Sequence, residues 1–177
     1  MFHSICGFDS DEGKRVSMIL ILMGPTGAGK TTVGEILSRQ LGWEFADADN
    51  FHSPENVAKM SRGVGLTDED RKPWLAALRR KIEQWIDAGQ NGILACSALK
   101  EAYRKALSAG QQVKWVYLKG SFEEISQRVA ARQGHYAKKE LVVSQFAALE
   151  EPTEAITIDV NRSPEEIARE IRTIISV

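Results

Sequence analysis

The sequence has few cysteines, no long apolar run and almost no net charge, and each of these absences narrows the class of protein. Its two cysteines, Cys6 and Cys96, fit neither a disulfide framework nor the ligand spacing of a metal site. No apolar stretch approaches the roughly 20 residues that cross a bilayer, so we expect no membrane partner. The net charge of −1 leaves no general basic surface, which argues against nucleic acid as the main partner.

The first 16 residues mix acidic, basic and glycine residues and lack the apolar segment of a secretory signal peptide. We therefore expect a flexible N-terminal extension over residues 1–16 and a single domain over residues 17–177, in a reducing, cytoplasmic setting. Hydrophobic residues make up 43% of the chain and charged residues 27%. This composition is typical of a globular protein with a packed core.

Short apolar segments alternate with amphipathic ones from Ser17 onward, which predicts an α/β fold. Continuous apolar runs that stop at glycine or at polar residues are typical of strands buried on both faces of a parallel sheet. The predicted strands cover 18–23, 43–46, 92–96, 113–118 and 155–158. The predicted helices cover 30–41, 73–88 with Pro73 in the first turn, 100–109, and two segments that start at the capping boxes of Ser121 and Ser163. The alternation predicts a three-layer α/β/α sandwich with a mostly parallel five-stranded sheet.

A glycine-rich segment, GPTGAGKTT, follows the first predicted strand and precedes the first predicted helix. It fits the P-loop motif G-x-x-x-x-G-K-[ST] in the structural context that the motif requires. Its glycines allow backbone N–H groups to turn toward phosphate oxygens, and the helix N-terminus adds a favourable field. Lys30 would reach the β- and γ-phosphates of ATP, and the Thr31 hydroxyl would bind Mg²⁺. The predicted nucleotide-binding residues of this loop are Gly24, Pro25, Thr26, Gly27, Ala28, Gly29, Lys30, Thr31 and Thr32.

The absence of other nucleotide motifs narrows the class of P-loop protein. The sequence contains neither the Asn-Lys-x-Asp segment that reads guanine nor a strand that ends in Asp-x-x-Gly, which excludes a GTPase. The chain is also too short for a motor ATPase. A small-metabolite or nucleotide kinase of the nucleoside-monophosphate-kinase-like type remains. A nucleotide-binding regulator that has lost transfer activity is the alternative from another class.

Two carboxylates, Asp47 and Asp49, come directly after the second predicted strand, at the edge where open parallel sheets bind ligands. We expect Asp47 to lie near Mg²⁺ and Asp49 to accept the hydroxyl proton of the phosphate acceptor. A solvated acidic turn is the alternative. Residues 47–75 have little apolar periodicity and are predicted as a long functional loop. Arg71, near the end of this loop, could bind a substrate carboxylate through two hydrogen bonds.

These residues belong to blocks in which the chain resembles gluconokinases of the small P-loop kinase type, which are related to shikimate kinases. The matching segments are GPTGAGKTT, DADNFHSPENVAKM, GVGLTDEDRKPWL, CSALKEAYR, RQGHY and LVVSQFAALEEP, from about Met18 to Pro152. Tyr136 stands where gluconokinases often have phenylalanine. The resemblance implies ATP-dependent and Mg²⁺-dependent phosphorylation of D-gluconate to 6-phospho-D-gluconate, and a homodimer. Shikimate, another sugar acid or a nucleotide stays open as the acceptor.

The resemblance also implies roles for regions and single residues. It implies a substrate-binding region over about 47–80, in which His52 binds substrate hydroxyls, and a lid over about 133–145. Asn161 lies where related kinases hold adenine.

Four basic side chains and one histidine complete the predicted site. Arg128 and Arg132 share a helix face because they are four residues apart. The resemblance implies that they stabilise the transferring phosphoryl group, with His135 contacting the substrate, although both arginines could instead face water. Lys100 and Arg104 follow the third predicted strand, where a substrate-binding role and a surface role are both open.

Overall fold

A computed structural model describes residues 17–131 and 136–177, with the backbone alone for residues 136–139. Its centre is a five-stranded sheet of order β2-β3-β1-β4-β5, in which every neighbouring pair is parallel. The strands are β1 Ile19–Met23, β2 Glu44–Asp47, β3 Gly92–Ala95, β4 Val113–Lys119 and β5 Ile156–Asp159. The sheet is therefore parallel throughout, where the sequence predicted a mostly parallel one.

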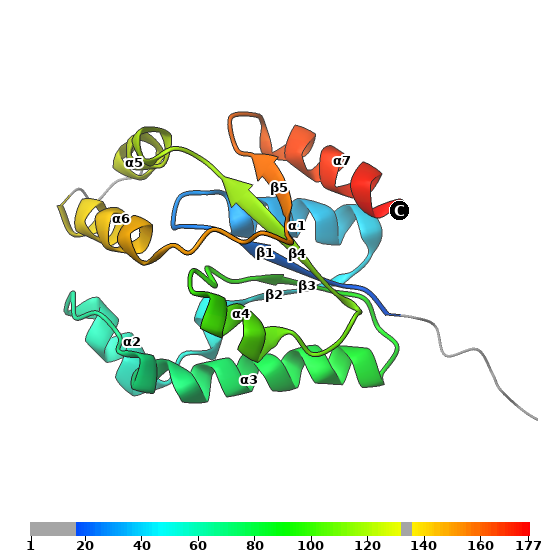
Figure 1. Ribbon diagram of the computed structural model, residues 1–177, viewed down its shortest axis with the longest axis horizontal. Coiled ribbons are helices and arrows are strands. Elements are labelled where there is room, and N and C mark those ends of the chain that lie inside the picture. Colours follow the sequence, from blue (N-terminus) through cyan, green and yellow to red (C-terminus); the bar gives the residue numbers. More distant parts are fainter. Residues whose placement is uncertain (1–16, 132–135) are drawn as a thin grey trace, which may run out of the picture.

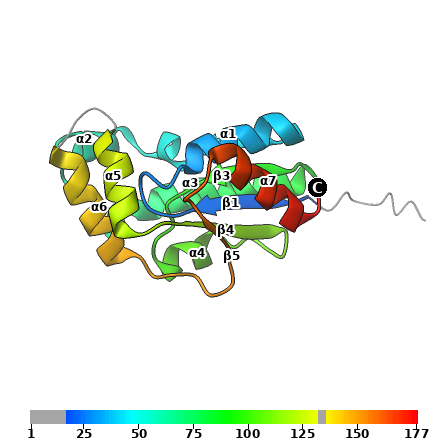
Figure 2. The same cartoon turned by 90° about the horizontal axis from the view of Figure 1, so that it is seen from above.

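Helices cover both faces of the sheet and confirm the predicted three-layer sandwich (Figures 1 and 2). α1 and α7 pack on one face and α3 and α4 on the other, while α5 and α6 stand side by side at one end. The helices are α1 Lys30–Leu41, α2 Pro54–Ser61, α3 Asp68–Asp87, α4 Glu101–Leu107, α5 Phe122–Ala131, α6 Tyr136–Ala148 and α7 Pro164–Ile175, with a short 3-10 helix, η1, at Ala48–Phe51.

The central strand β1 is buried along its whole length. Leu20 and Leu22 belong to the core on the side of α1 and α7, and Ile21 belongs to the core on the side of α3. A strand with both faces covered has no solvated side, so its sequence is continuously apolar rather than alternating. This explains why the apolar run of residues 18–23 predicted the strand correctly.

Helix α3 begins five residues before the predicted start. Thr67 and Asp70 form a capping box, in which the Asp70 N–H donates to Thr67 Oγ1 at 3.1 Å and the Thr67 N–H donates to Asp70 Oδ2 at 2.9 Å. Pro73 therefore lies inside the helix rather than in its first turn. Proline has no N–H, so the Glu69 carbonyl loses the hydrogen bond that residue 73 would donate in a regular helix. Glu69 and Pro73 are both exposed, so water can solvate this carbonyl instead.

The predicted long loop over residues 47–75 contains η1 and α2, and this prediction of a structureless stretch is wrong. Ser53 caps α2 by accepting a hydrogen bond from the Asn56 N–H at 3.3 Å, and Pro54 takes the first helical position. These cap signals are polar, and Val57 and Met60 on α2 stay exposed. The helix therefore lacks the apolar stripe by which a sequence usually reveals one.

The strand order sets the position of the site. β1 lies between β3 and β4, so the loops after β1 and after β3 leave the sheet side by side, where ligands bind in open α/β sheets. Across residues 17–131 and 136–177, none of the helices combines the length and the apolar character needed to cross a membrane.

Candidate active site

The phosphate loop connects β1 to α1 and has the backbone that the P-loop motif predicts. Gly24 has φ +139°, and a Cβ there would lie 2.7 Å from the Leu118 carbonyl oxygen. Gly29 precedes α1 with φ +93°, a left-handed conformation that favours glycine. Lys30 Nζ donates to the carbonyl oxygens of Gly24 and Pro25, at 3.0 Å each. The lysine thus lies along the loop that would hold phosphate.

The two residues predicted to bind Mg²⁺ meet in the structure. Thr31 Oγ1 donates to Asp47 Oδ2 at 2.7 Å, and Asp47 Oδ1 accepts a hydrogen bond from the Asp49 N–H at 3.0 Å. Among the described residues, no group of three or more acidic, histidine or cysteine side chains could hold a metal ion. Mg²⁺ usually keeps several waters and takes only one or two protein oxygens. Thr31 and Asp47 therefore fit a Mg²⁺ ion.

Cys96 directly follows β3 and is close to three of the predicted site residues. Burial raises the pKa of its thiol to about 12, while Lys30 lowers this pKa and Asp49 and Asp47 raise it. The side chain is 1% exposed. The thiol is therefore buried, and Lys30, Asp47 and Asp49 all lie close enough to affect its pKa.

His52 lies within electrostatic reach of both the predicted base, Asp49, and the predicted carboxylate-binding arginine, Arg71. Its ring stacks on Trp74 with centroids 4.7 Å apart and planes within 9°, and Trp74 Nε1 donates to the Ala48 carbonyl at 2.7 Å. Burial lowers the pKa of His52, with Asp49 opposing this shift and Arg71 adding to it. Its buried Nδ1 has no hydrogen-bond partner in the part of the chain that the structure describes.

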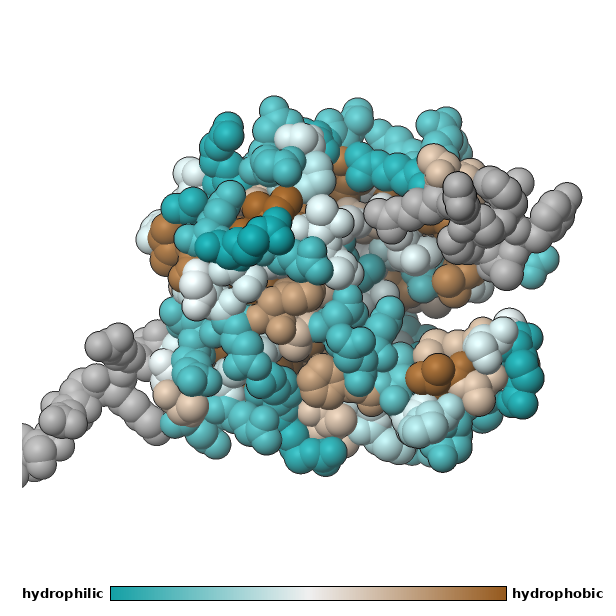
Figure 3. All heavy atoms as spheres, turned by 180° about the vertical axis from the view of Figure 1, so that it is seen from behind, coloured by the Kyte–Doolittle hydropathy of each residue, from teal (hydrophilic) through white to brown (hydrophobic). Residues whose placement is uncertain are grey.

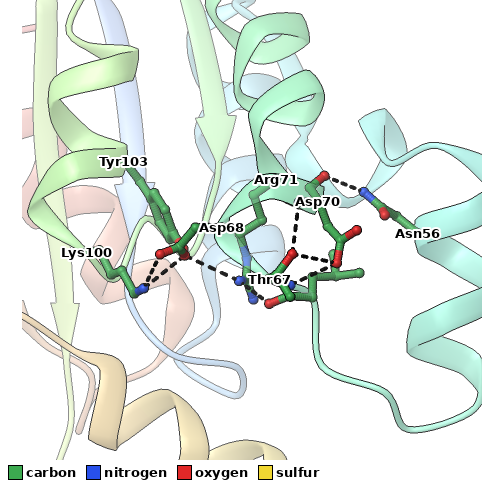
Figure 4. A network of polar contacts seen from close by, with 8 residues as sticks. Asn56, Thr67, Asp68, Asp70, Arg71, Lys100 and Tyr103 are labelled. Atoms are coloured by element: carbon green, nitrogen blue, oxygen red, sulfur yellow. Dashed lines mark hydrogen bonds and ion pairs between the residues drawn. The ribbon is translucent and has the colours of Figure 1, made fainter.

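Arg71 and Lys100 converge on one carboxylate, that of Asp68. Lys100 Nζ lies 2.9 Å from both Asp68 oxygens, Arg71 Nη1 lies 3.9 Å from Oδ1, and the Tyr103 hydroxyl donates to Oδ1. The two cations also lie over the Tyr103 ring, 5.8 Å and 5.6 Å from its centroid. Figure 4 shows these side chains, from α3 and from the start of α4, turned toward one another. We call Asp68, Arg71, Lys100 and Tyr103 the acceptor cluster.

The electrostatics of the acceptor cluster favour an added anion. Hydrogen bonds from Tyr103 and Lys100 lower the pKa of Asp68, and the bond to Asp68 raises the pKa of Lys100. Two cations against one carboxylate leave a net positive charge, and the Asp68 side chain is 59% exposed. A negatively charged group from solvent can therefore reach this cluster. The sequence did not indicate Asp68 and Tyr103 as site residues, although both lie in segments that carry the family resemblance, GVGLTDEDRKPWL and CSALKEAYR.

Arg104 has a different environment from Lys100. It is buried, and its Nη1 donates to the carbonyl oxygens of Ala98 and Leu99 at 3.0 Å each. Ala98 has φ +42°, a strained conformation for a residue other than glycine. The surface alternative for Arg104 is therefore wrong. Its guanidinium holds the loop that carries Lys100, and its predicted substrate contact stays a prediction.

Arg128 and Asn161, predicted to stabilise the phosphoryl group and to contact adenine, lie near each other. The Arg128 guanidinium donates to the Val160 carbonyl, which precedes Asn161. Asn161 is exposed, and its N–H donates to Asp159 Oδ1 at 2.8 Å. Arg132 and His135 lie outside the described residues.

Part of the predicted lid packs against the rest of the molecule. Val142 is fully buried, and Gln145 Oε1 accepts a hydrogen bond from the Thr26 N–H at 2.6 Å. The surface is hollowed between the part that carries α2 and α3 and the part that carries α5 and α6 (Figure 3). The phosphate loop lies at this end of the molecule (Figure 1).

Comparison with known proteins agrees with this geometry. A family model described as shikimate kinase matches residues 26–176. A probable gluconokinase of Xenopus tropicalis is 41% identical over 173 residues, covering 87% of this chain and 91% of that protein. The thermoresistant gluconokinase of Escherichia coli K12 is 38% identical, covering 81% and 85%. The crystal structure of a gluconokinase from Sinorhizobium meliloti 1021 matches with a TM-score of 0.81 at 35% identity, covering 92% and 93%.

Proposed function

Because the chain belongs to the gluconokinase family of P-loop kinases, we propose that it transfers the γ-phosphoryl group of ATP to D-gluconate. The observation that carries this proposal is the acceptor cluster, in which Arg71 and Lys100 meet at one exposed carboxylate. His52 is within electrostatic reach of both Asp49 and Arg71. Gluconate has a carboxylate at one end, which this cluster could bind, and a primary hydroxyl at the other, which would lie near Asp49.

On the donor side, the phosphate loop would supply backbone N–H groups and the Lys30 ammonium. Groups fixed before the reaction stabilise developing charge without the cost of reorganisation. A Mg²⁺ ion held through Thr31 and Asp47 would neutralise charge on the phosphates. The hydrogen bonds of Lys30 to two loop carbonyls would be exchanged for bonds to phosphate oxygens.

On the acceptor side, Asp49 would accept the proton of the attacking hydroxyl. Arg71 and Lys100 would bind the gluconate carboxylate at the acceptor cluster. The lowered pKa of His52 favours a neutral ring at pH 7. A neutral ring whose buried Nδ1 lacks a described partner is suited to a hydrogen bond with a substrate hydroxyl.

Several finer assignments rest on resemblance alone. These are adenine at Asn161, charge stabilisation by Arg128 and Arg132, a substrate contact of His135 and a homodimer. A cytoplasmic location rests on the cysteine content and on the absence of a signal-peptide segment. They stay part of the proposal.

A substrate panel tests the proposed function. ADP release by the full chain is measured with Mg²⁺ and ATP against gluconate, shikimate, glucitol and AMP. Shikimate is the second candidate because the matching family model is described as shikimate kinase. We expect gluconate to give the highest kcat/KM, and glucitol, which has a CH₂OH group in place of the carboxylate, to be poor. Turnover of shikimate or AMP with gluconate inert would refute the acceptor. Nucleotide binding without any ADP release would favour a regulator.

A further inference from the structure

The segment from Gln145 to Glu150, at the end of α6 and in the turn that follows, contacts both halves of the proposed site. We call this segment the brace. Neither Gln145 nor Glu150 has a role in the chemistry described above. Both make hydrogen bonds to backbone groups that are distant in sequence.

On the donor side, the brace fixes the phosphate loop. The Thr26 N–H donates to Gln145 Oε1 at 2.6 Å. The helix that carries Gln145 is itself held, because Val142 is fully buried and Phe146 packs edge-on against Phe122 with ring centroids 5.4 Å apart. An acceptor on a fixed helix therefore satisfies one N–H of the loop and favours one loop conformation.

On the acceptor side, the brace contacts the residues on either side of Lys100. The Glu150 N–H donates to the Leu99 carbonyl at 2.9 Å, and the Glu101 N–H donates to Glu150 Oε2 at 2.5 Å. Lys100 occupies the N-cap position of α4, but its ammonium is bonded to Asp68. Glu150 thus supplies, from a distant segment, an acceptor for the first N–H of a helix whose N-cap side chain caps none.

We propose that Gln145 and Glu150 are positioning residues that set the two halves of the active site relative to each other. Gln145 holds the phosphate loop in its binding conformation, and Glu150 holds the loop that aims Lys100 at the acceptor carboxylate. The Glu150 half rests on the proposed function, because it assumes that Lys100 binds the substrate. The Gln145 half needs only nucleotide binding.

The Gln145 half is tested with a non-hydrolysable ATP analogue and Mg²⁺, without acceptor. Gln145→Ala should weaken the analogue about tenfold, as expected when a hydrogen bond that orders a binding loop is lost. Ser144→Ala, the exposed neighbour on α6, serves as the matched control and should bind like the wild type. An unchanged or tighter Kd in a folded Gln145→Ala protein would overturn this half.

The Glu150 half is tested by steady-state kinetics. Glu150→Ala should raise the gluconate KM about tenfold while the ATP KM and kcat stay within about threefold. Glu150→Gln keeps an oxygen acceptor for the Glu101 N–H and should restore the wild-type gluconate KM. The exposed Glu154→Ala is the control.

Two results would overturn the role of Glu150. One is an unchanged gluconate KM in Glu150→Ala, and the other is an equal rise in Glu150→Gln. Should Glu150→Ala fail to fold, the glutamine variant alone decides, since the proposal requires it to behave like the wild type. A wild type that does not phosphorylate gluconate would refute the proposed function but leave the analogue-binding test of Gln145 valid.

Discussion

Lys30 is the side chain on which the donor half of the site depends. Its ammonium lies 3.0 Å from two carbonyls of the phosphate loop and extends along the surface that would hold the phosphates. Replacing it with alanine should lower turnover about a thousandfold, the effect of losing ~4 kcal/mol of transition-state stabilisation. Circular dichroism should show an intact fold, and the exposed Lys114→Ala should keep wild-type turnover. Near-wild-type activity of folded Lys30→Ala would remove this residue from the mechanism.

Substitutions of Asp49 and of Arg71 should change different kinetic constants. Proton transfer develops only in the transition state, so Asp49→Asn should mainly lower kcat, by a factor of about 10² to 10⁴. The carboxylate contact exists in both ground and transition states, so Arg71→Ala should mainly raise the gluconate KM. Steady-state kinetics at saturating ATP and Mg²⁺ measures both. An unchanged gluconate KM in Arg71→Ala would mean that another group, with Lys100 as the first candidate, holds the carboxylate.

The early start of helix α3 should be visible in the acid stability of the protein. Lys59, 2.6 Å from Asp70, and the capping contacts with Thr67 lower the pKa of Asp70 from 3.8 to about 2. Because the folded-state pKa is the lower one, this stabilisation is complete above about pH 3.8 and is lost as the pH falls toward 2.

Urea unfolding of wild type and Asp70→Asn between pH 5 and pH 2 measures this effect. We expect the two stability curves to converge as the pH falls, because the variant has no carboxylate to protonate. A constant difference between the two curves at every pH would exclude this role of Asp70.

The two parts of helix α6 should differ in their rates of amide hydrogen exchange. Val142 and Gln145 hold the part from residue 142 to 148 against the core and the phosphate loop. We expect slow amide exchange there in every state, and faster exchange over residues 136–141 that slows when an ATP analogue and gluconate bind. Mass-spectrometric exchange with and without ligands measures both parts. Equal exchange in both states over residues 136–141 would remove the argument for a moving lid.

The elements that the sequence predicted well are those with strong local signals. Strand β1 is a continuous apolar run, and α1 follows a complete phosphate-loop motif, so its predicted bounds match the observed Lys30–Leu41. The starts of α2 and α3 depend on polar caps at Ser53 and Thr67, which a search for apolar periodicity does not weigh. Proline favours the first turn of a helix, which predicts a start near Pro73, but a capping box upstream overrides that preference.

For the site, single residues were predictable and their partners were not. The sequence indicated Arg71 and Lys100 separately, yet their meeting at Asp68 requires α3 to pack beside α4. The pair Thr31 and Asp47 was predictable because Asp47 ends one strand and Thr31 follows the loop after another strand of the same parallel sheet, whose carboxyl ends share an edge. The contacts of Gln145 and Glu150 span 119 and 49 residues, and no local pattern encodes them.

At the scale of the whole molecule, the strand order brings donor and acceptor groups together. The phosphate loop follows β1, and the loop that carries Lys100 follows the neighbouring strand β3. The N-terminal part of α3 adds Asp68 and Arg71 from the adjacent layer. Gluconate should therefore bind in one orientation, with its carboxylate at the acceptor cluster and its far hydroxyl near Asp49.

The position of the phosphate on the product tests this orientation most directly. Full-length protein is incubated with ATP, Mg²⁺ and gluconate, and the product is examined by proton–phosphorus correlation NMR, with Lys30→Ala as the inactive control. We expect one phosphate ester, on the terminal CH₂ hydroxyl farthest from the carboxylate. An ester on a secondary hydroxyl, or release of inorganic phosphate with no ester formed, would contradict it.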